Sequence, residues 1–149
     1  MKNSKPAPGF TLLEGMVCIW LLSTVLFLLV PHVERSMERR WMEELVGNYL
    51  ADYAYAQSLA ISQGVHATIQ FVPEQYFYMV RLRNTTVKKV SYHRRIRVDS
   101  NLGLPYPHGV RFDNRGYVHQ GGTITLSGKY EKRRLIIQLV TGRIRVEKE

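Results

Sequence analysis

Gly9-Phe10-Thr11-Leu12-Leu13-Glu14 opens an apolar run that extends to Val30, and this stretch decides which kind of protein the chain is. Phe10 to Val30 is 21 residues long and contains one charged side chain, that of Glu14. A helix of that length measures about 30 Å, which matches the hydrocarbon core of a bilayer. The run therefore predicts a helix that spans a membrane.

The charges around this run predict its orientation. Lys2 and Lys5 precede the run, and no charge follows it until Glu34. We therefore expect a cytoplasmic N-terminus and the bulk of the chain outside. A secretory signal peptide would end its apolar region in a small-x-small cleavage site, but the far end here reads Leu28-Leu29-Val30-Pro31-His32. A plain signal anchor accounts for the length and orientation but not for Glu14.

A carboxylate inside a membrane helix costs about 2.5–3.5 kcal/mol on insertion scales, so Glu14 needs a reason. A short basic leader ending in Gly9, then Phe-Thr-Leu-Leu-Glu, then about 20 apolar residues resembles the signal of type IV pilins and pseudopilins. The resemblance implies that prepilin peptidase cleaves between Gly9 and Phe10 and that the new Phe10 amine is methylated. Glu14 would then pair with the Phe10 ammonium of a neighbouring subunit, which offsets the desolvation of both charges. Pro31 matches the proline at which the family's helix kinks or locally melts.

The helix is expected to continue beyond the membrane. Apolar residues recur at steps of four, and the intervening positions are polar, among them Glu38 and Asp52. This pattern predicts an amphipathic helix with an apolar stripe on a core and a polar face in solvent. Gly64 is the expected C-cap, so we expect one helix from Phe10 to Ser62. The predicted stripe consists of Val33, Met37, Trp41, Leu45, Tyr49 and Tyr53.

From Val65 onward the pattern changes to an alternation typical of strands. Short alternating runs separated by turn residues predict an antiparallel sheet packed on the helix stripe. The fold class is therefore α+β, with a long N-terminal helix packed on an antiparallel sheet. We expect strands or strand pairs at 65–71, 76–82, 87–98, 123–126, 135–139 and 144–146, and a hairpin that joins 110–112 to 117–119.

Two segments of this region resemble the GspH/FimT group of minor pilins. They are the helix end at 55–64 and the pairing of 110–116 with a terminal hairpin that ends in 141–146. The external region lacks cysteine and the leader is short, which also suits ComGD-type competence minor pseudopilins of Gram-positive bacteria. This resemblance implies a pilin-like fold, a filament of major and minor pilin subunits, and no cofactor.

The composition excludes several chemistries. The single cysteine, Cys18, lies in the apolar run, so no disulfide within the chain can form. The five histidines are scattered and show no metal-ligand spacing, and no nucleophile elbow or P-loop occurs. We expect no enzyme activity, no catalytic residue and no metal site.

A formal net charge of +9 makes polyanions plausible partners. Arg143 and Arg145 fall on one face of the last predicted strand, with guanidiniums about 7 Å apart, close to the spacing of phosphates on one nucleic-acid strand. FimT-like competence pilins resemble this, with a Gly-Arg-x-Arg that contacts DNA, matched here by Gly142, Arg143 and Arg145. The DNA-binding hypothesis includes Lys132, Arg133 and Arg134 as well. The alternatives are a solvated sheet face and arginines that pair with acidic neighbours in a filament.

Taken together, these features predict three segments: a leader at 1–9, a transmembrane and assembly helix at 10–31, and an extracytoplasmic α+β domain at 32–149. The favoured function is a minor structural subunit of a competence (DNA-uptake) pilus, membrane-anchored before assembly and then part of a cell-surface filament. Its expected partners are other pilin subunits, prepilin peptidase, the cytoplasmic membrane and double-stranded DNA. One alternative is a GspH-like pseudopilin of a type II secretion system, with no DNA role. Another is a membrane-tethered binding module that never assembles.

Overall fold

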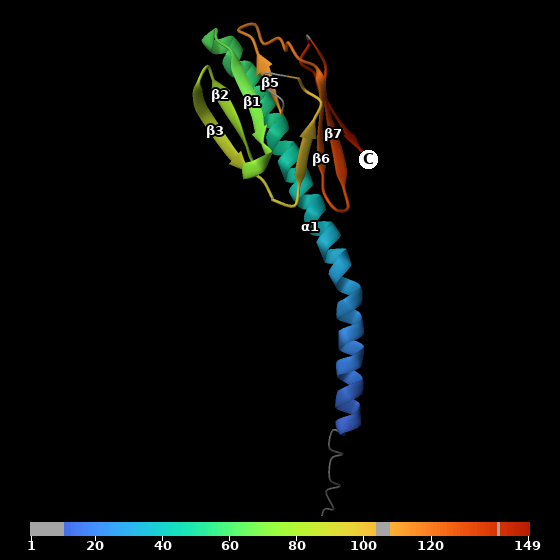
Figure 1. Cartoon of the computed structure of the whole chain (residues 1–149). Coiled ribbons are helices and arrows are strands. Elements are labelled where there is room, and N and C mark those ends of the chain that lie inside the picture. Colours follow the sequence, from blue (N-terminus) through green and yellow to red (C-terminus); the bar gives the residue numbers. More distant parts are fainter. Residues whose placement is uncertain (1–10, 104–107, 140) are drawn as a thin grey trace, which may run out of the picture. The chain divides into compact units, whose positions relative to one another are not determined.

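A single long helix begins the described chain. The computed structural model describes residues 11–103, 108–139 and 141–149, so the predicted leader and its junction at Gly9 and Phe10 lie outside the described residues. Helix α1 spans Leu12–Gln63 and continues through Pro31 (Figure 1). Thr11 caps its start, because its hydroxyl accepts a hydrogen bond from the Glu14 amide at 3.3 Å. Gly64 ends it with a φ of 63°, which confirms the predicted C-cap.

The chain divides into two compact units at Ser36 and Met37. In the first unit the helix begins at Leu12, and its apolar side chains from Leu12 to Val30 are exposed. By length and composition this is the one helix among the described residues that could cross a membrane. The hydroxyls of Ser23 and Thr24 donate to the carbonyls of Ile19 and Trp20 at 2.8 and 2.9 Å, so both are satisfied within the helix.

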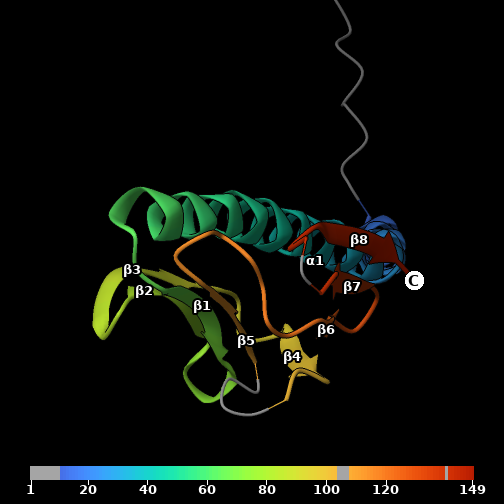
Figure 2. The ribbon, with the colours of Figure 1, turned by 90° about the horizontal axis from the view of Figure 1, so that it is seen from above.

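Among the described residues of the second unit, eight strands form two antiparallel sheets, both of which contribute to the core around α1 (Figures 1 and 2). The prediction of a single sheet is therefore wrong, although the fold class is confirmed. Sheet A has the order β3-β2-β1-β5, and the 3₁₀ turn Pro73–Gln75 joins β1 to β2; sheet B has the order β4-β6-β7-β8. The strands are β1 Ala67–Val72, β2 Phe77–Leu82, β3 Thr85–Ser91, β4 Arg97–Ser100, β5 Gly109–Phe112, β6 Gly122–Ser127, β7 Lys132–Ile137 and β8 Ile144–Lys148.

The predicted hairpin after β5 is largely absent. A single bridge pairs Phe112 with Val118, and residues 117–119 form no strand. Asp113 explains the difference, because its carboxylate accepts the amides of Arg115 and Tyr117 at 2.9 and 2.8 Å. These bonds wind the segment into a compact turn, with Gly116 at a φ of 80°, instead of a ladder.

An aromatic cluster joins α1 to sheet A. Tyr49 stacks on Phe71 with ring centroids 4.8 Å apart and meets Tyr78 edge-on at 5.5 Å. Tyr53 meets Phe112 edge-on at 4.8 Å. These offset and edge-to-face contacts are the geometries that aromatic pairs prefer. They confirm that the tyrosines of the predicted stripe belong to the core.

The prediction is wrong for the N-terminal part of the apolar stripe. Met37 and Val33 are 46% and 50% exposed, whereas Met42 and the carboxylate of Glu38 are buried. The turn between β6 and β7 approaches the helix on the side of Glu38, and Glu38 accepts the amides of Tyr130 and Glu131 at 2.6 and 3.1 Å. The burial of Glu38 therefore follows from hydrogen bonds that no helical periodicity encodes.

Asp52 was also predicted to face solvent, and this too is wrong. It is 4% exposed and accepts a hydrogen bond from the Tyr78 hydroxyl at 2.8 Å. Lys88 of β3 pairs with its other oxygen at 2.6 Å. A polar position on the helix is therefore the point at which sheet A is fixed to α1.

A substitution at Gly128 tests how closely the β6–β7 turn packs against Glu38. A Cβ added at Gly128 would lie 2.2 Å from Oε1 of Glu38, so the Gly128→Ala variant must displace a buried, hydrogen-bonded carboxylate. We expect the free energy of unfolding to fall by about 2–4 kcal/mol. Thermal unfolding of the full chain in detergent, followed by the near-UV circular dichroism of the tyrosine cluster, measures this loss.

Gly47→Ala is the matched control, because a Cβ at Gly47 meets nothing within 4 Å. Alanine in a helix is favoured over glycine by about 1 kcal/mol, so this variant should unfold at a higher temperature. Equal stability of the Gly128→Ala variant and the native chain would show that the turn does not depend on Glu38.

Candidate functional site

The five cations of the DNA-binding hypothesis lie on or next to β7 and β8. Register pairs Ile136 with Arg145 and Arg134 with Glu147. Leu135 and Ile137 are buried, so the alternate positions of β7, which include Lys132 and Arg134, fall on the outer face of sheet B. The structure thus brings four of the five candidates to one face, and Arg133 lies on the other.

Three of these cations have close acidic partners, and Arg145 has a looser one. Arg133 is only 15% exposed at its side chain and lies 3.2 Å from Glu131 and 3.8 Å from Glu43. Lys132 and Arg134 both pair with Glu149. Because Glu43, Glu131 and Glu149 lie beside these side chains, the Lys-Arg-Arg run presents much less net positive charge than its three cations indicate.

Arg143 and Arg145 are the accessible pair. Arg145 is 76% exposed, and its Nε lies 3.6 Å from Glu147, a loose contact. Arg143 is exposed and forms no ion pair with the residues that the structure describes. Ile144 and Val146 between and beyond them are half-buried, which is the predicted alternation. Two outward guanidiniums therefore remain available at this end of the hairpin.

The turn before Arg143 is held to the helix by a residue assigned only to the core stripe. The Tyr53 hydroxyl donates to the Gly142 carbonyl at 2.9 Å. Gly142 has a φ of 62°, and a Cβ there would lie 3.0 Å from Val118. Burial raises the pKa of Tyr53, so its hydroxyl stays a donor at all physiological pH values. Tyr53 therefore positions the turn that presents Arg143.

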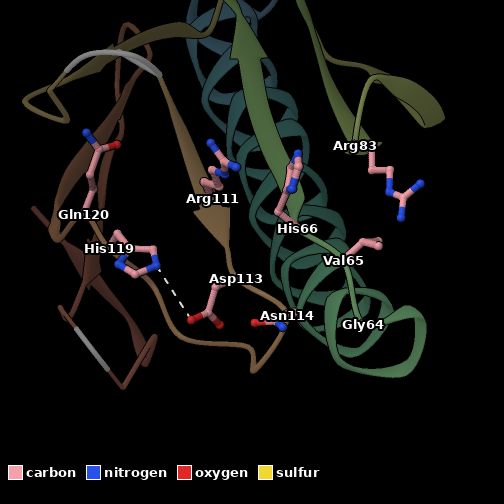
Figure 3. A pocket seen from close by; sticks show the side chains of 9 residues that line it. All are labelled: Gly64, Val65, His66, Arg83, Arg111, Asp113, Asn114, His119 and Gln120. Atoms are coloured by element: carbon pink, nitrogen blue, oxygen red, sulfur yellow. Dashed lines mark ion pairs between the residues drawn. The ribbon is translucent and has the colours of Figure 1, made fainter.

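A second basic surface lies on the face of sheet A that points away from α1. It is a pocket of about 670 Å³ that opens over the ends of β1, β2 and β5 (Figure 3). His66 lies between Arg111 and Arg83, and the loop that carries His119 and Gln120 faces them. The remaining lining residues are Gly64, Val65, Asp113 and Asn114. This pocket was not predicted, because its residues are separated along the chain.

Asp113 is the one acid that lines the pocket. Burial disfavours its charge, but the amides of Tyr117 and Arg115 and the nearby His119 outweigh that effect, so the pKa of Asp113 lies below its ordinary value. One oxygen accepts both amides, and the other lies 3.7 Å from His119. Asp113 therefore stays ionised and is engaged within its own loop.

No group of three metal-ligating side chains lies close together among the residues that the structure describes. His93 stacks on Trp41 with centroids 3.7 Å apart, and His108 contacts the Ser100 hydroxyl at 3.0 Å. These two histidines take part in packing and hydrogen bonding between loops and neighbouring elements.

Comparison with known proteins identifies the architecture. The sequence matches no protein-family model and no curated protein sequence. Among solved structures, the type IV minor pilin FimU of Pseudomonas aeruginosa is similar, with a TM-score of 0.58 and 18% identity over 74% of this chain and 90% of FimU. The minor pseudopilin EpsH of the Vibrio cholerae type 2 secretion system is similar with a TM-score of 0.57 and 14% identity, over 71% of this chain and 95% of EpsH.

The fold is pilin-like. At these identities the likeness establishes the fold, a long N-terminal helix packed on antiparallel sheets. Neither neighbour is named as an enzyme, which is consistent with the expectation from the sequence. The pilin-like fold thus supplies a helix with an exposed apolar segment and a domain that carries two basic surfaces.

Glu131 makes the stability of the domain depend on pH. Burial disfavours its charge, but hydrogen bonds from Lys148 and Arg133 at 3.1 and 3.2 Å dominate and lower its pKa. A depressed folded-state pKa contributes stability that is present above the unfolded value, near 4.5, and is lost as the pH falls through the folded value. We expect Glu131→Gln to reduce the loss of unfolding free energy between pH 5 and pH 3.

Urea unfolding of the full chain in detergent at several pH values measures this slope. Glu74→Gln, at an exposed position, is the control and should leave the acid limb of the profile unchanged. An unaltered slope for Glu131→Gln would mean that the Lys148 and Arg133 contacts do not persist in solution.

Proposed function

We propose that the chain is a minor subunit of a type IV pilin-like filament, held in the membrane by residues 10–31 before assembly. The observation that carries the proposal is one coincidence. The sequence that resembles a prepilin signal leads directly into the helix of a pilin-like fold. Cleavage between Gly9 and Phe10, methylation of Phe10, and assembly with other major and minor pilins follow from that resemblance. In this proposal the N-terminus faces the cytoplasm and the domain lies outside, then at the cell surface.

The start of α1 supports an assembly role for Glu14. Thr11 caps the helix, and Glu14 is the third residue of the first turn, where the helix dipole favours negative charge. This placement offsets part of the cost of a carboxylate in an apolar segment. A positive charge from a neighbouring subunit would offset the rest, and a methylated Phe10 amine supplies one.

Glu14→Ala tests this role. We expect the variant to be inserted and cleaved normally but to enter filaments at least tenfold less than the native chain, because the charge pair between subunits is lost. Immunoblots of sheared filament and membrane fractions measure the distribution. Glu44→Ala, an exposed glutamate in the second unit, is the matched control. Normal incorporation of the Glu14→Ala variant contradicts the charge pair, and the absence of the native chain from filaments favours a tethered module.

We further propose that the filament is a competence filament and that Arg143 and Arg145 contact the phosphates of double-stranded DNA. Support comes from the Gly142-Arg143-x-Arg145 pattern, from the outward position of both arginines and from the turn that Tyr53 fixes. Such contacts are electrostatic and read little sequence. Lys132 and Arg134 strengthen them only to the extent that Glu149 leaves their charge available.

Two double variants with opposite expected effects on DNA affinity test the DNA contact. Arg143→Ala/Arg145→Ala should weaken binding of a 30-base-pair duplex about tenfold and reduce the salt slope by about 2, because two phosphate contacts are lost. Glu147→Gln/Glu149→Gln should strengthen binding severalfold, because it frees Arg145, Lys132 and Arg134. Fluorescence anisotropy with the full chain in detergent, across a salt series, measures both.

Absence of duplex binding by the native chain would favour a secretion pseudopilus. The secretion pseudopilus stays an alternative because the EpsH structure matches this chain about as well as the FimU structure does. The pilin-like assembly proposal would stand in that case, because it rests on Glu14 and not on the hairpin.

A further inference from the structure

We propose that the pocket on the outer face of sheet A is a binding site for a phosphate group, carried by a small phosphate ester or by a phosphodiester chain. The proposal rests on the pocket alone and is independent of the DNA contact assigned to Arg143 and Arg145. Its residues come from the segment between α1 and β1, from the turn after β2, from β5 and from the loop after β5.

The floor of the pocket is set by strand register. Ala67 pairs with Leu82 on one side and with Phe112 on the other. His66, which immediately precedes β1, therefore lies between Arg83 and Asp113, and the Arg83 amide donates to the His66 carbonyl at 3.0 Å. One step further into the sheet, Thr68 lies between Arg81 and Arg111. Cationic groups thus flank the central strand on both sides.

The two arginines that line the pocket have no acidic partner within ion-pair distance among the residues that the structure describes. This distinguishes Arg83 and Arg111 from Lys132, Arg133 and Arg134 on sheet B, each of which has one. Asp113 offsets part of this charge, but one acid stands against two arginines, and its oxygens contact two amides and His119 and neither guanidinium. The pocket therefore keeps net positive charge and two guanidinium forks for an incoming anion.

Arg83 occupies a position that suits another residue better. Its φ of 53° lies in the left-handed region, where glycine or asparagine is favoured and other side chains are strained. A strained residue at the rim of a pocket points to a use for its side chain. Glycine would relieve the backbone but would remove the guanidinium.

The shape favours a single phosphate group over a flat electrostatic track. The pocket is concave, with the sheet as its floor and walls formed by Gly64-Val65 at the helix end and by the loop that carries His119 (Figure 3). Its volume of about 670 Å³ lies in the range of small-molecule sites. His66 before β1, Arg83 after β2 and Arg111 on β5 offer donors from three segments. This arrangement suits a tetrahedral oxyanion better than a planar carboxylate, which one arginine fork satisfies.

The test is calorimetric titration of the full chain in detergent with inorganic phosphate, with thymidine 5′-monophosphate and with a short duplex that lacks terminal phosphates. We expect saturable 1:1 binding of at least one of the three probes. Inorganic phosphate or the monophosphate identifies a small ester as the ligand, and the duplex alone identifies a phosphodiester chain. Arg83→Gly/Arg111→Gln should weaken that binding at least tenfold. Arg83→Gly alone should weaken it severalfold without a loss of thermal stability, so misfolding cannot explain the effect.

Arg94→Gln/Arg97→Gln is the matched control, because it removes the same charge from exposed positions outside the pocket. It should change the affinity by less than threefold. An equal loss in this control would show that general electrostatics, and not the pocket, attracts the probe. Arg143→Ala/Arg145→Ala should leave binding of the monophosphate unchanged. The proposal for the pocket and the proposal for the hairpin can therefore be tested separately. No saturable binding of any probe at millimolar concentration would overturn the proposal.

Discussion

Two buried carboxylates on one helix fix the domain. Glu38 accepts two amides from the β6–β7 turn, and Asp52 accepts the Tyr78 hydroxyl and pairs with Lys88. They lie fourteen residues apart on α1, or about 21 Å along the helix axis. Each carboxylate is costly to bury unless its hydrogen-bond partners are in place, so each allows only one position of its sheet on the helix. Burial of the apolar stripe drives the packing of the sheets on the helix. The two acids determine where along the helix each sheet packs.

This division explains what the sequence could predict. Periodicity located α1, its Gly64 cap and the tyrosine core, because burial of apolar side chains repeats with the helix. It placed Glu38 and Asp52 in solvent, because a pattern of polarity cannot distinguish a hydrated carboxylate from one with protein partners. The alternating pattern predicted one sheet instead of two for a similar reason. Strand partners depend on contacts distant in sequence, and Asp113 turned an expected hairpin into a loop.

The same limit applies to charge. A run such as Lys132-Arg133-Arg134 looks strongly basic along the chain, yet Glu147 lies opposite Arg134 and Glu149 pairs with Lys132 and Arg134. His66, Arg83 and Arg111 look unremarkable in sequence because no two are adjacent. Register on sheet A brings them together without a partner acid of their own. The formal net charge of +9 therefore does not indicate which cations of the two sheets lack an acidic partner.

The two basic surfaces are held by neighbouring positions of one helix. Tyr53 binds the carbonyl of Gly142 beside Arg143, and Gln57, one turn further, donates to the carbonyl of Gly116 in the loop that walls the pocket. Both glycines have positive φ. A Cβ at Gly116 would crowd Ile61 of the helix, and a Cβ at Gly142 would crowd Val118. Since residues four apart share a helix face, the hairpin turn and the pocket loop are fixed by one rigid surface. The geometry of each basic surface is therefore set by the helix beneath it, and neither depends on a flexible loop for its position.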